Sequence, residues 1–406
     1  RATERVVALG VNNNDRFNLN VNDNIDNNRP ALGIGPSSGT FPMKTYKHLF
    51  ERLISLENLE NAYWKARKHK SKNPRVQEFE KHWQLHLATL HRELKTKTYK
   101  TKPLRKFILR DPKTRTICVS DFRDRVVHHA LINILQPIFE PRFIHDSYAS
   151  RQGKGSLPAL KRLKAFLRKV THNGKIVRGA KDANAVKGYA LKADIKHYFE
   201  TVEHDVLLAI IAKRIKDNSV LWLVKTILDN NPCTTRAKGM PLGNWTSQFF
   251  ANVYLNELDQ FVKHKLKAKY YIRYVDDFVI LHTSKTILQK HKEQIGKFLQ
   301  TLKLDLHPDK CKIIPLSRGV SFLGFRVFYH YKLVRQRNLR KIHRRLKELL
   351  DLYESRLADA QDVLEILQGW NGYAMQGNTH HLRQRLTMMV EQKLETRTTH
   401  SPKPSG

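Results

Sequence analysis

The chain has 406 residues, 40% of them hydrophobic, which is enough for one large domain or two to three ordinary domains with buried cores. Lysine and arginine number 74 against 37 acidic residues, so the formal net charge is +37. Such a charge favours a polyanionic partner; nucleic acid is the leading inference and an anionic membrane surface is the rival. No apolar run approaches the ~18 residues of a membrane-spanning helix, so we predict no membrane partner.

The cysteines indicate the compartment. Cys118, Cys233 and Cys311 lie far apart and form no C-x-x-C pair. This pattern argues against a structural zinc site and a disulfide framework, and it fits a reducing environment. We therefore predict a cytoplasmic protein that handles nucleic acid.

Residues 1–42 differ in composition from the rest of the chain. They are rich in asparagine and their charges cancel, so the whole net charge lies downstream. We predict that this low-complexity segment is poorly ordered and lies outside the main fold. Met43 then opens an amphipathic helical pattern, and residues 43–98 are predicted to form a helical extension where the folded protein begins.

Between about Tyr99 and Val334, short strand patterns alternate with helical patterns. There is no regular βαβ repeat and no G-x-G-x-x-G motif, so the sequence predicts an α+β fold. The predicted strands include 115–121, 189–194 and 320–330, and the predicted helices include 125–139 and 247–266.

After Arg335 the chain becomes helical and strongly basic. Helices are predicted over about 335–357, 358–370 and 379–395, followed by a disordered tail at 396–406. Arg340 and Arg344 flank an apolar stripe on the first helix, where they could track the phosphates of a nucleic-acid duplex. A helix lying on a membrane surface is the alternative, although packing explains the stripe better.

Two adjacent acids interrupt the apolar run "YIRYVDDFVIL" at residues 271–281. Strands are depleted in aspartate, so Asp276 and Asp277 are predicted to mark the turn of a hairpin. Asp194 ends the strand-like "GYALKAD", and the backbone carbonyl of Ile195 follows it. Carboxylates that converge from separate strands suit two-metal phosphoryl transfer by Mg²⁺. The alternative interpretations are that Asp276 and Asp277 form a solvated turn and that Asp194 is a helix N-cap. The three acids together in so basic a chain favour the metal site.

These blocks resemble the reverse transcriptases. The palm-like blocks occur in order as "GYALKADIKHYFETV", "KGMPLGNWTSQFFANVYLNELD", "YIRYVDDFVILH", "LDLHPDKCKI" and "VSFLGFRV". The resemblance covers about residues 95–335 and, less specifically, the helices to about 390. It implies a right-hand polymerase with fingers at 99–185, a palm with contributions from the fingers at 186–334, and a helical thumb at 335–395. It also implies RNA-directed DNA polymerase activity, two Mg²⁺ ions with Mn²⁺ as a substitute, dNTPs, a template RNA and a cDNA–primer duplex.

The resemblance also assigns roles to single residues. Asp194, Asp276 and Asp277 become the catalytic carboxylates. Phe199 takes the position that blocks a nucleotide's 2′-OH; a core phenylalanine is the alternative. Arg115 matches the arginine that binds the triphosphate in this family. The alternative is that Arg115 is an ordinary exposed arginine of a strand. The nucleotide site also draws on Gln248, and on either Lys310 or Lys312, between which the sequence does not choose.

One block indicates the subclass. Leu242-Gly243 to Ser247-Gln248 reads "LGNWTSQ" and resembles the diversity-generating retroelement class, with Leu242, Gly243 and Ser247 near the template. That class copies a template-repeat RNA with errors at adenines to vary a target gene, and works with a small basic oligomeric accessory protein. Residues 1–42 read either as translated adenine-rich template or as an ordinary low-complexity tail. The alternatives are a group II intron-type or other free-standing bacterial reverse transcriptase with ordinary fidelity, and a non-enzymatic RNA-binding protein on a polymerase fold.

Overall fold

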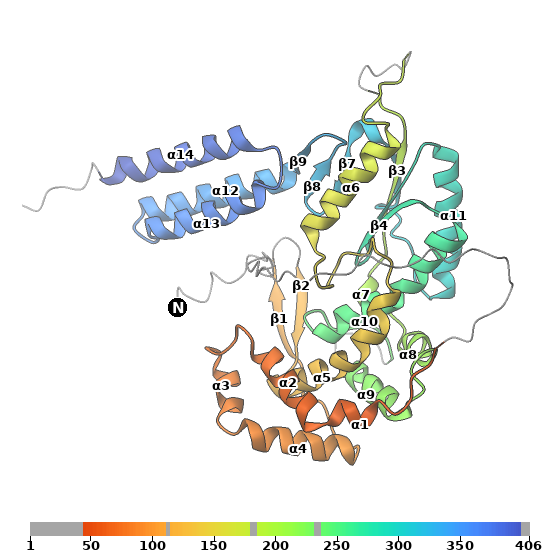
Figure 1. Ribbon diagram of the computed structural model, residues 1–406. Coiled ribbons are helices and arrows are strands. Elements are labelled where there is room, and N and C mark those ends of the chain that lie inside the picture. The colour runs from red at the N-terminus through yellow and green to blue at the C-terminus, as the bar shows by residue number, and fades with distance from the viewer. Residues whose placement is uncertain (1–43, 111–113, 179–184, 231–236, 399–406) are drawn as a thin grey trace, which may run out of the picture. The chain divides into compact units, whose positions relative to one another are not determined.

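The computed structural model describes residues 44–110, 114–178, 185–230 and 237–398 (Figure 1). The predicted segment 1–42 therefore lies outside the described residues, as do Met43 and Cys233. The chain divides into two compact units, and each is built from two stretches of sequence. The first unit takes residues up to Gln136 and then His204–Ser247, and the second takes Pro137–Glu203 and Gln248 onward. The predicted palm range 186–334 is thus divided between the two units.

The first unit is mainly helical, with one two-stranded antiparallel sheet (Figure 1). Its elements are α1 (Phe50–Ile54), α2 (Leu56–Arg67), α3 (Pro74–Glu80), α4 (Trp83–Lys95), β1 (Arg105–Leu109), β2 (Arg115–Val119), most of α5 (Phe122–Phe139), α8 (His204–Ala212) and α9 (Asn218–Asp229).

Caps explain where the first helices begin. The sequence pattern that opens at Met43 yields two helices, because Ser55 leaves the helical conformation and its hydroxyl accepts from Asn58 N at 3.2 Å. Asp217 joins two distant helices: one carboxylate oxygen accepts from Leu49 N and Phe50 N at 2.8 and 3.0 Å, and the other caps α9. The start of the first helix therefore depends on a residue far along the chain.

The second unit contains a four-stranded antiparallel sheet and a three-stranded antiparallel sheet (Figure 1). Its elements up to the last strand are η3 (Glu140–Arg142), α6 (Ser156–Val170), β3 (Tyr189–Asp194), α7 (Tyr198–Thr201), most of α10 (Trp245–Gln260), η4 (Phe261–Lys265), β4 (Tyr270–Tyr274), β5 (Asp277–His282), α11 (Lys285–Thr301), β6 (Lys312–Pro315), η5 (Leu316–Arg318), β7 (Val320–Phe322), β8 (Phe325–Val327) and β9 (Lys332–Val334).

The larger sheet has the strand order β4-β5-β3-β6, so the two central strands are β5 and β3. Four consecutive residues of β5, Phe278–Leu281, are buried, which means that both faces of the sheet are covered. Helix α6 packs on β4 and β5, and α11 packs on β3, β5 and β6. The buried central strands give the sheet end a rigid base for polar side chains.

Three helices follow the second sheet: α12 (Gln336–Glu354), α13 (Ala360–Ala374) and α14 (His380–Thr398). Buried residues of α12, α13 and α14 join one hydrophobic cluster with α6 and both sheets. The helix α13 extends beyond the predicted end near 370, and α14 continues into the segment predicted as a tail from 396.

Gly324 fixes the junction between the small sheet and these helices. It adopts φ +87°, and an added Cβ would lie 2.4 Å from the hydroxyl of Tyr373. That hydroxyl donates to the Gly324 carbonyl at 2.9 Å and accepts from Asn338 Nδ2 at 2.8 Å.

The predicted mixture of helices and antiparallel strands is confirmed. No helix in the described ranges has the length and apolar character needed to cross a membrane.

Candidate active site

The hairpin of β4 and β5 turns one residue earlier than the sequence pattern predicts. Tyr274 pairs with Asp277, so the turn residues are Val275 and Asp276, and Asp277 opens β5. Val275 has φ +53°, in the left-handed region. For a residue other than glycine this conformation costs about 1–2 kcal/mol, and a β-branched side chain makes it rarer still. The turn is therefore held by contacts outside itself.

The strand β3 brings a third acid to the same sheet end. Asp194 is the last residue of β3 and lies directly opposite Asp277 in the antiparallel register. Ile195 N donates to the Asp276 carbonyl at 3.3 Å, which ties the residue after β3 to the turn. Because opposed side chains in such a pair share a face, Asp194 and Asp277 point to the same side of the sheet. The sheet thus gathers the three predicted carboxylates at one edge.

Two lysines neutralise part of this acidic cluster. Lys192 lies two residues before Asp194, on the same face of β3, and donates to Asp277 Oδ2 at 3.1 Å. Lys310 donates to Asp194 Oδ1 at 2.8 Å. Of the two lysines left open by the sequence, Lys310 is therefore the one that reaches Asp194, whereas Lys312 pairs with Lys192 in the ladder.

The environment of Asp277 disfavours its charged form. Its side chain is 22% exposed, and its Oδ1 atom is buried with no hydrogen-bond partner among the described residues. Burial raises the pKa of Asp277 to about 6, against the lowering effect of Lys192, and the charges of Asp194 and Asp276 raise it further. An oxygen with no partner, beside two other carboxylates, is suited to meet an added cation.

The donor types fit a hard divalent cation, because such ions prefer carboxylate and carbonyl oxygens. The buried oxygen of Asp277 supports this fit. In the part of the chain that the structure describes, however, no group of three or more His, Cys, Asp or Glu side chains is arranged so that it could hold a metal ion. The ammonium groups of Lys192 and Lys310 supply the positive charge that Asp277 and Asp194 meet in this arrangement.

Other predicted residues of the second unit lie on nearby elements. Phe199 is in α7, five residues after Asp194; its side chain is half-buried and its ring lies 5.4 Å from that of Tyr198, which is the buried member of the pair. Gln248 is exposed on α10, where its Oε1 accepts from the Ser150 hydroxyl at 2.8 Å. Phe199 is thus partly exposed, whereas Tyr198 is buried.

The first unit holds the predicted Arg115 and the predicted residues from Leu242 to Ser247. Arg115 is exposed at the start of β2. The half-buried Leu242 accepts through its carbonyl from Cys118 N at 2.8 Å. Gly243 has φ +115°, and an added Cβ would lie 2.9 Å from Ile117 Cγ2 and 3.0 Å from the Cys118 carbonyl. The loop is therefore fixed against β2.

The side chain of the predicted Ser247 is buried within α10, as is that of its neighbour Thr246. On α12, the predicted Arg340 and Arg344 are both exposed, and Arg344 forms an ion pair with Glu348 at 3.6 Å. Of the pair Ser247-Gln248, only Gln248 presents its side chain to solvent.

Sequence reasoning missed two charged residues at this site. Lys192 could have been found, since the alternation of "LKAD" puts it on the face of Asp194. Arg273 is fully buried in β4, and a charged residue in an otherwise apolar strand is the signal that identifies it.

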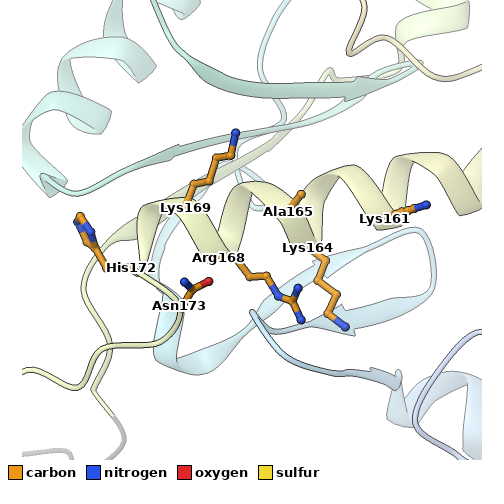
Figure 2. A pocket seen from close by; sticks show the side chains of 7 residues that line it. All are labelled: Lys161, Lys164, Ala165, Arg168, Lys169, His172 and Asn173. Atoms are coloured by element: carbon orange, nitrogen blue, oxygen red, sulfur yellow. The ribbon is translucent and has the colours of Figure 1, made fainter.

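A basic hollow lies along α6, apart from the residues of the carboxylate cluster. It has a volume of about 650 Å³ and is lined by Lys161, Lys164, Ala165, Arg168, Lys169, His172 and Asn173. Figure 2 shows the side chains of Lys164 and Arg168 extending to the same side of the helix. The lining holds four basic residues and no carboxylate, so it is suited to an anion.

Comparison with known proteins connects this geometry to a family. Residues 100–327 match the family model described as reverse transcriptase (RNA-dependent DNA polymerase). The protein YkfC of Escherichia coli is 27% identical, over 59% of this chain and 71% of that protein. The group II intron-encoded protein LtrA of Lactococcus lactis is 26% identical, over 57% of this chain and 48% of that protein. The match thus spans about half of LtrA.

The solved structures that align with this chain include telomerases. Telomerase from Candida albicans, in complex with a fragment of telomeric RNA, aligns with a TM-score of 0.43 at 11% identity, over 74% of this chain and 60% of that chain. Apo telomerase from Candida tropicalis aligns with a TM-score of 0.41 at 14% identity, over 58% of this chain and 47% of that chain.

Proposed function

We propose how individual residues carry out polymerisation, on the premise that this chain belongs to the reverse transcriptase family, the RNA-dependent DNA polymerases. The family model spans residues 100–327, which is more than half of the chain. The family generally uses divalent metal ions. For this chain we propose two Mg²⁺ ions, with Mn²⁺ as a substitute.

Asp194, Asp276 and Asp277 are the proposed ligands, together with the backbone carbonyl of Ile195. When bound, such ions stabilise the attacking and the leaving oxygens of nucleotidyl transfer. The observation that carries this proposal is the placement of Asp194 opposite Asp277, beside the turn that contains Asp276. Lys310, whose side chain is 41% exposed, is proposed to move between Asp194 and the phosphates of the incoming nucleotide.

Three further residues are proposed to select and bind the nucleotide. Phe199 excludes the 2′-OH by its bulk, which its partial exposure on α7 supports. Arg115 binds the triphosphate through its forked guanidinium, which is exposed on β2. Gln248 contributes an exposed amide whose orientation is set by Ser150.

We also propose that the chain divides as a right-hand polymerase does, with fingers at 99–185, a palm with contributions from the fingers at 186–334, and a thumb at 335–395. The larger sheet with its carboxylate edge corresponds to the palm, and the basic helix α12 to the thumb. The proposed template RNA and product duplex would contact exposed arginines of α12, including Arg340 and Arg344, and the basic hollow along α6.

We further propose the diversity-generating subclass, which copies a template RNA with errors at adenines. The support is the "LGNWTSQ" block, with Leu242 and Gly243 fixed against β2 and Gln248 exposed beyond them. A loop fixed in this way sets the geometry around a templating base, so its sequence could decide fidelity. A small basic oligomeric accessory protein is the proposed partner.

A second candidate is a group II intron-type enzyme with ordinary fidelity. The similarity to LtrA, a group II intron-encoded protein, favours this candidate. The two candidates share the same chemistry and differ in the errors they make, so the sequence of the product separates them.

The test is to sequence cDNA made by the purified protein on a defined RNA with scattered adenines, with and without the proteins encoded beside its gene. Errors concentrated at template adenines would support the diversity-generating class. Faithful cDNA would support reverse transcriptase activity and would favour the intron-type candidate over the diversity-generating class.

Asp276→Asn serves as the control, because it keeps the turn and removes one charge. It should lower the rate by about 10²–10⁴-fold, equal to several kcal/mol of transition-state stabilisation. Equal activity in this variant, or no cDNA from the unmodified protein under any priming condition, would contradict the proposal.

A further inference from the structure

Arg273 forms a fully buried ion pair beneath the catalytic turn. The side chains of Arg273 and Asp259 are both 0% exposed, and two guanidinium nitrogens donate to the Asp259 carboxylate at 2.7 and 2.5 Å. The Tyr271 hydroxyl also donates to Asp259, at 2.7 Å. A buried pair of this kind often adds little stability over apolar residues of similar volume. Its presence in an apolar strand therefore points to a role beyond stability.

The remaining donors of Arg273 reach the turn. Its Nη1 donates to the Val275 carbonyl at 3.0 Å and to Asn252 Oδ1 at 3.3 Å. Val275 is the residue with φ +53°, and its carbonyl belongs to the peptide that leads directly into Asp276. The guanidinium thus holds the peptide whose orientation determines where the Asp276 carboxylate points.

The same residue is connected to the segment that contacts Gln248. Arg273 N donates to the Asp146 carbonyl at 2.9 Å, and its own carbonyl accepts from Tyr148 N at 3.0 Å. Asn252 Nδ2 donates to the Ala149 carbonyl at 2.8 Å, and the next residue along, Ser150, donates to Gln248. Arg273 therefore contacts the turn through its side chain, and it contacts Asp146 and Tyr148 through its backbone N–H and carbonyl, which remain when the side chain is substituted.

We propose that Arg273 is a positioning residue, whose guanidinium, neutralised by Asp259, holds Val275 in the left-handed conformation that aligns Asp276 and Asp277 with Asp194. The proposal rests on the proposed function of these carboxylates. Arg273 acts through the turn and touches no substrate. Loss of its forked donor should impair metal binding and the chemical step, with little effect on the binding of nucleotide or duplex.

The first test is Arg273→Lys. A lysine ammonium can meet Asp259 but cannot span the carboxylate and the Val275 carbonyl together, because it lacks the planar fork. We expect kcat to fall about 10–10²-fold while KM for dNTP and Kd for the primer–template duplex stay within about twofold. The affinity for Mn²⁺, measured by isothermal titration calorimetry, should fall in parallel.

The matched control is Arg151→Lys. Arg151 is also buried, with a side chain 7% exposed; it pairs with Glu140 at 2.7 Å and donates to two backbone carbonyls, but it does not contact the turn. Its substitution should lower resistance to urea without changing Mn²⁺ affinity. Equal loss of Mn²⁺ affinity in both variants would indicate general damage and overturn the proposal.

The turn itself gives a second test that leaves Arg273 in place. Val275→Gly removes the penalty at positive φ and should stay folded and active, whereas Val275→Pro cannot adopt φ +53° and should fold but lose Mn²⁺ affinity and activity. In the Arg273→Lys background, Val275→Gly should restore part of kcat. A folded Val275→Pro variant with full Mn²⁺ affinity would overturn the proposal.

The Mn²⁺ measurement also separates this inference from the proposed function. If the unmodified protein binds Mn²⁺ through Asp276 but makes no cDNA, the proposed function fails while the positioning role can still be judged from Mn²⁺ affinity. If cDNA is made and Arg273→Lys behaves as the unmodified protein in every readout, only the positioning role fails.

Discussion

Lowering the pH from 7 to 5 should weaken the first unit through a histidine buried in α5. His128 is 4% exposed, and burial lowers its pKa to about 3, with the nearby His129 and Arg125 adding to the effect. In the unfolded chain this histidine has the ordinary pKa of about 6.5. Below that pH His128 therefore binds a proton in the unfolded state but stays neutral in the folded state. The free energy of unfolding must therefore fall as the pH falls.

The magnitude follows from the two pKa values. Each pH unit between them removes about 1.4 kcal/mol per histidine, so at pH 5 His128 alone lowers the free energy of unfolding by about 2 kcal/mol. His129 has a pKa lowered to about 4, mainly by burial and then by Lys70 and Lys65, and it adds a loss of up to the same size. This decline is complete only below pH 3.

The assay compares urea unfolding at pH 5, 6 and 7 in the unmodified protein and in His128→Gln. Glutamine does not titrate, so the variant should lose about 2 kcal/mol less between pH 7 and pH 5, whatever its absolute stability. Hydrogen exchange over residues 122–139 assigns the change to α5. His82→Gln is the control, because His82 is exposed and its side chain makes no cap hydrogen bond to α4. Equal pH slopes in His128→Gln and the unmodified protein would refute the reasoning.

Three further predictions address the site and its supports. Phe199→Val should raise the kcat/KM for ribonucleotides relative to deoxynucleotides by about 10–10²-fold, and an unchanged ratio would make Phe199 a packing residue. Removing the charges of Lys161, Lys164 and Arg168 with glutamine should reduce the salt slope of single-stranded RNA binding by about 2, since each phosphate contact contributes about 0.7. The matched control removes three exposed lysines of α11: Lys285, Lys290 and Lys297. Gly243→Ala should lower the free energy of unfolding by about 1–3 kcal/mol through backbone strain and contact with β2. The control is Gly153→Ala, which has φ +67° and open space around it, so the loss of stability in that variant measures backbone strain alone.

The elements with a clear period could be predicted from sequence. The sequence predicts the strand Tyr189–Asp194 at its observed bounds, and the predicted helix over 125–139 lies within α5, because alternation and helical spacing are local properties. The clustering of the three aspartates also followed, since acids at strand ends in an apolar context have few structural uses.

The turn position and its support could not be predicted in the same way. Aspartate is depleted in strands, so local preference placed the turn on Asp276 and Asp277, yet Val275 occupies the left-handed position. That conformation depends on Arg273 and on Asp259 of a different element, and sequence periodicity does not report contacts of this kind. The grouping of 204–247 with the amino-terminal helices is a long-range property for the same reason.

The discontinuous first unit has a consequence for synthesis on the ribosome. Its two stretches are separated by residues 137–203, which belong to the other unit. At about 5–20 residues per second, translation of that intervening stretch takes roughly 3–13 seconds. Throughout this interval the nascent helix α1 lacks the Asp217 carboxylate that caps it. The growing chain therefore exposes apolar side chains of the first unit before that unit can close, and such exposed surface is what chaperones bind.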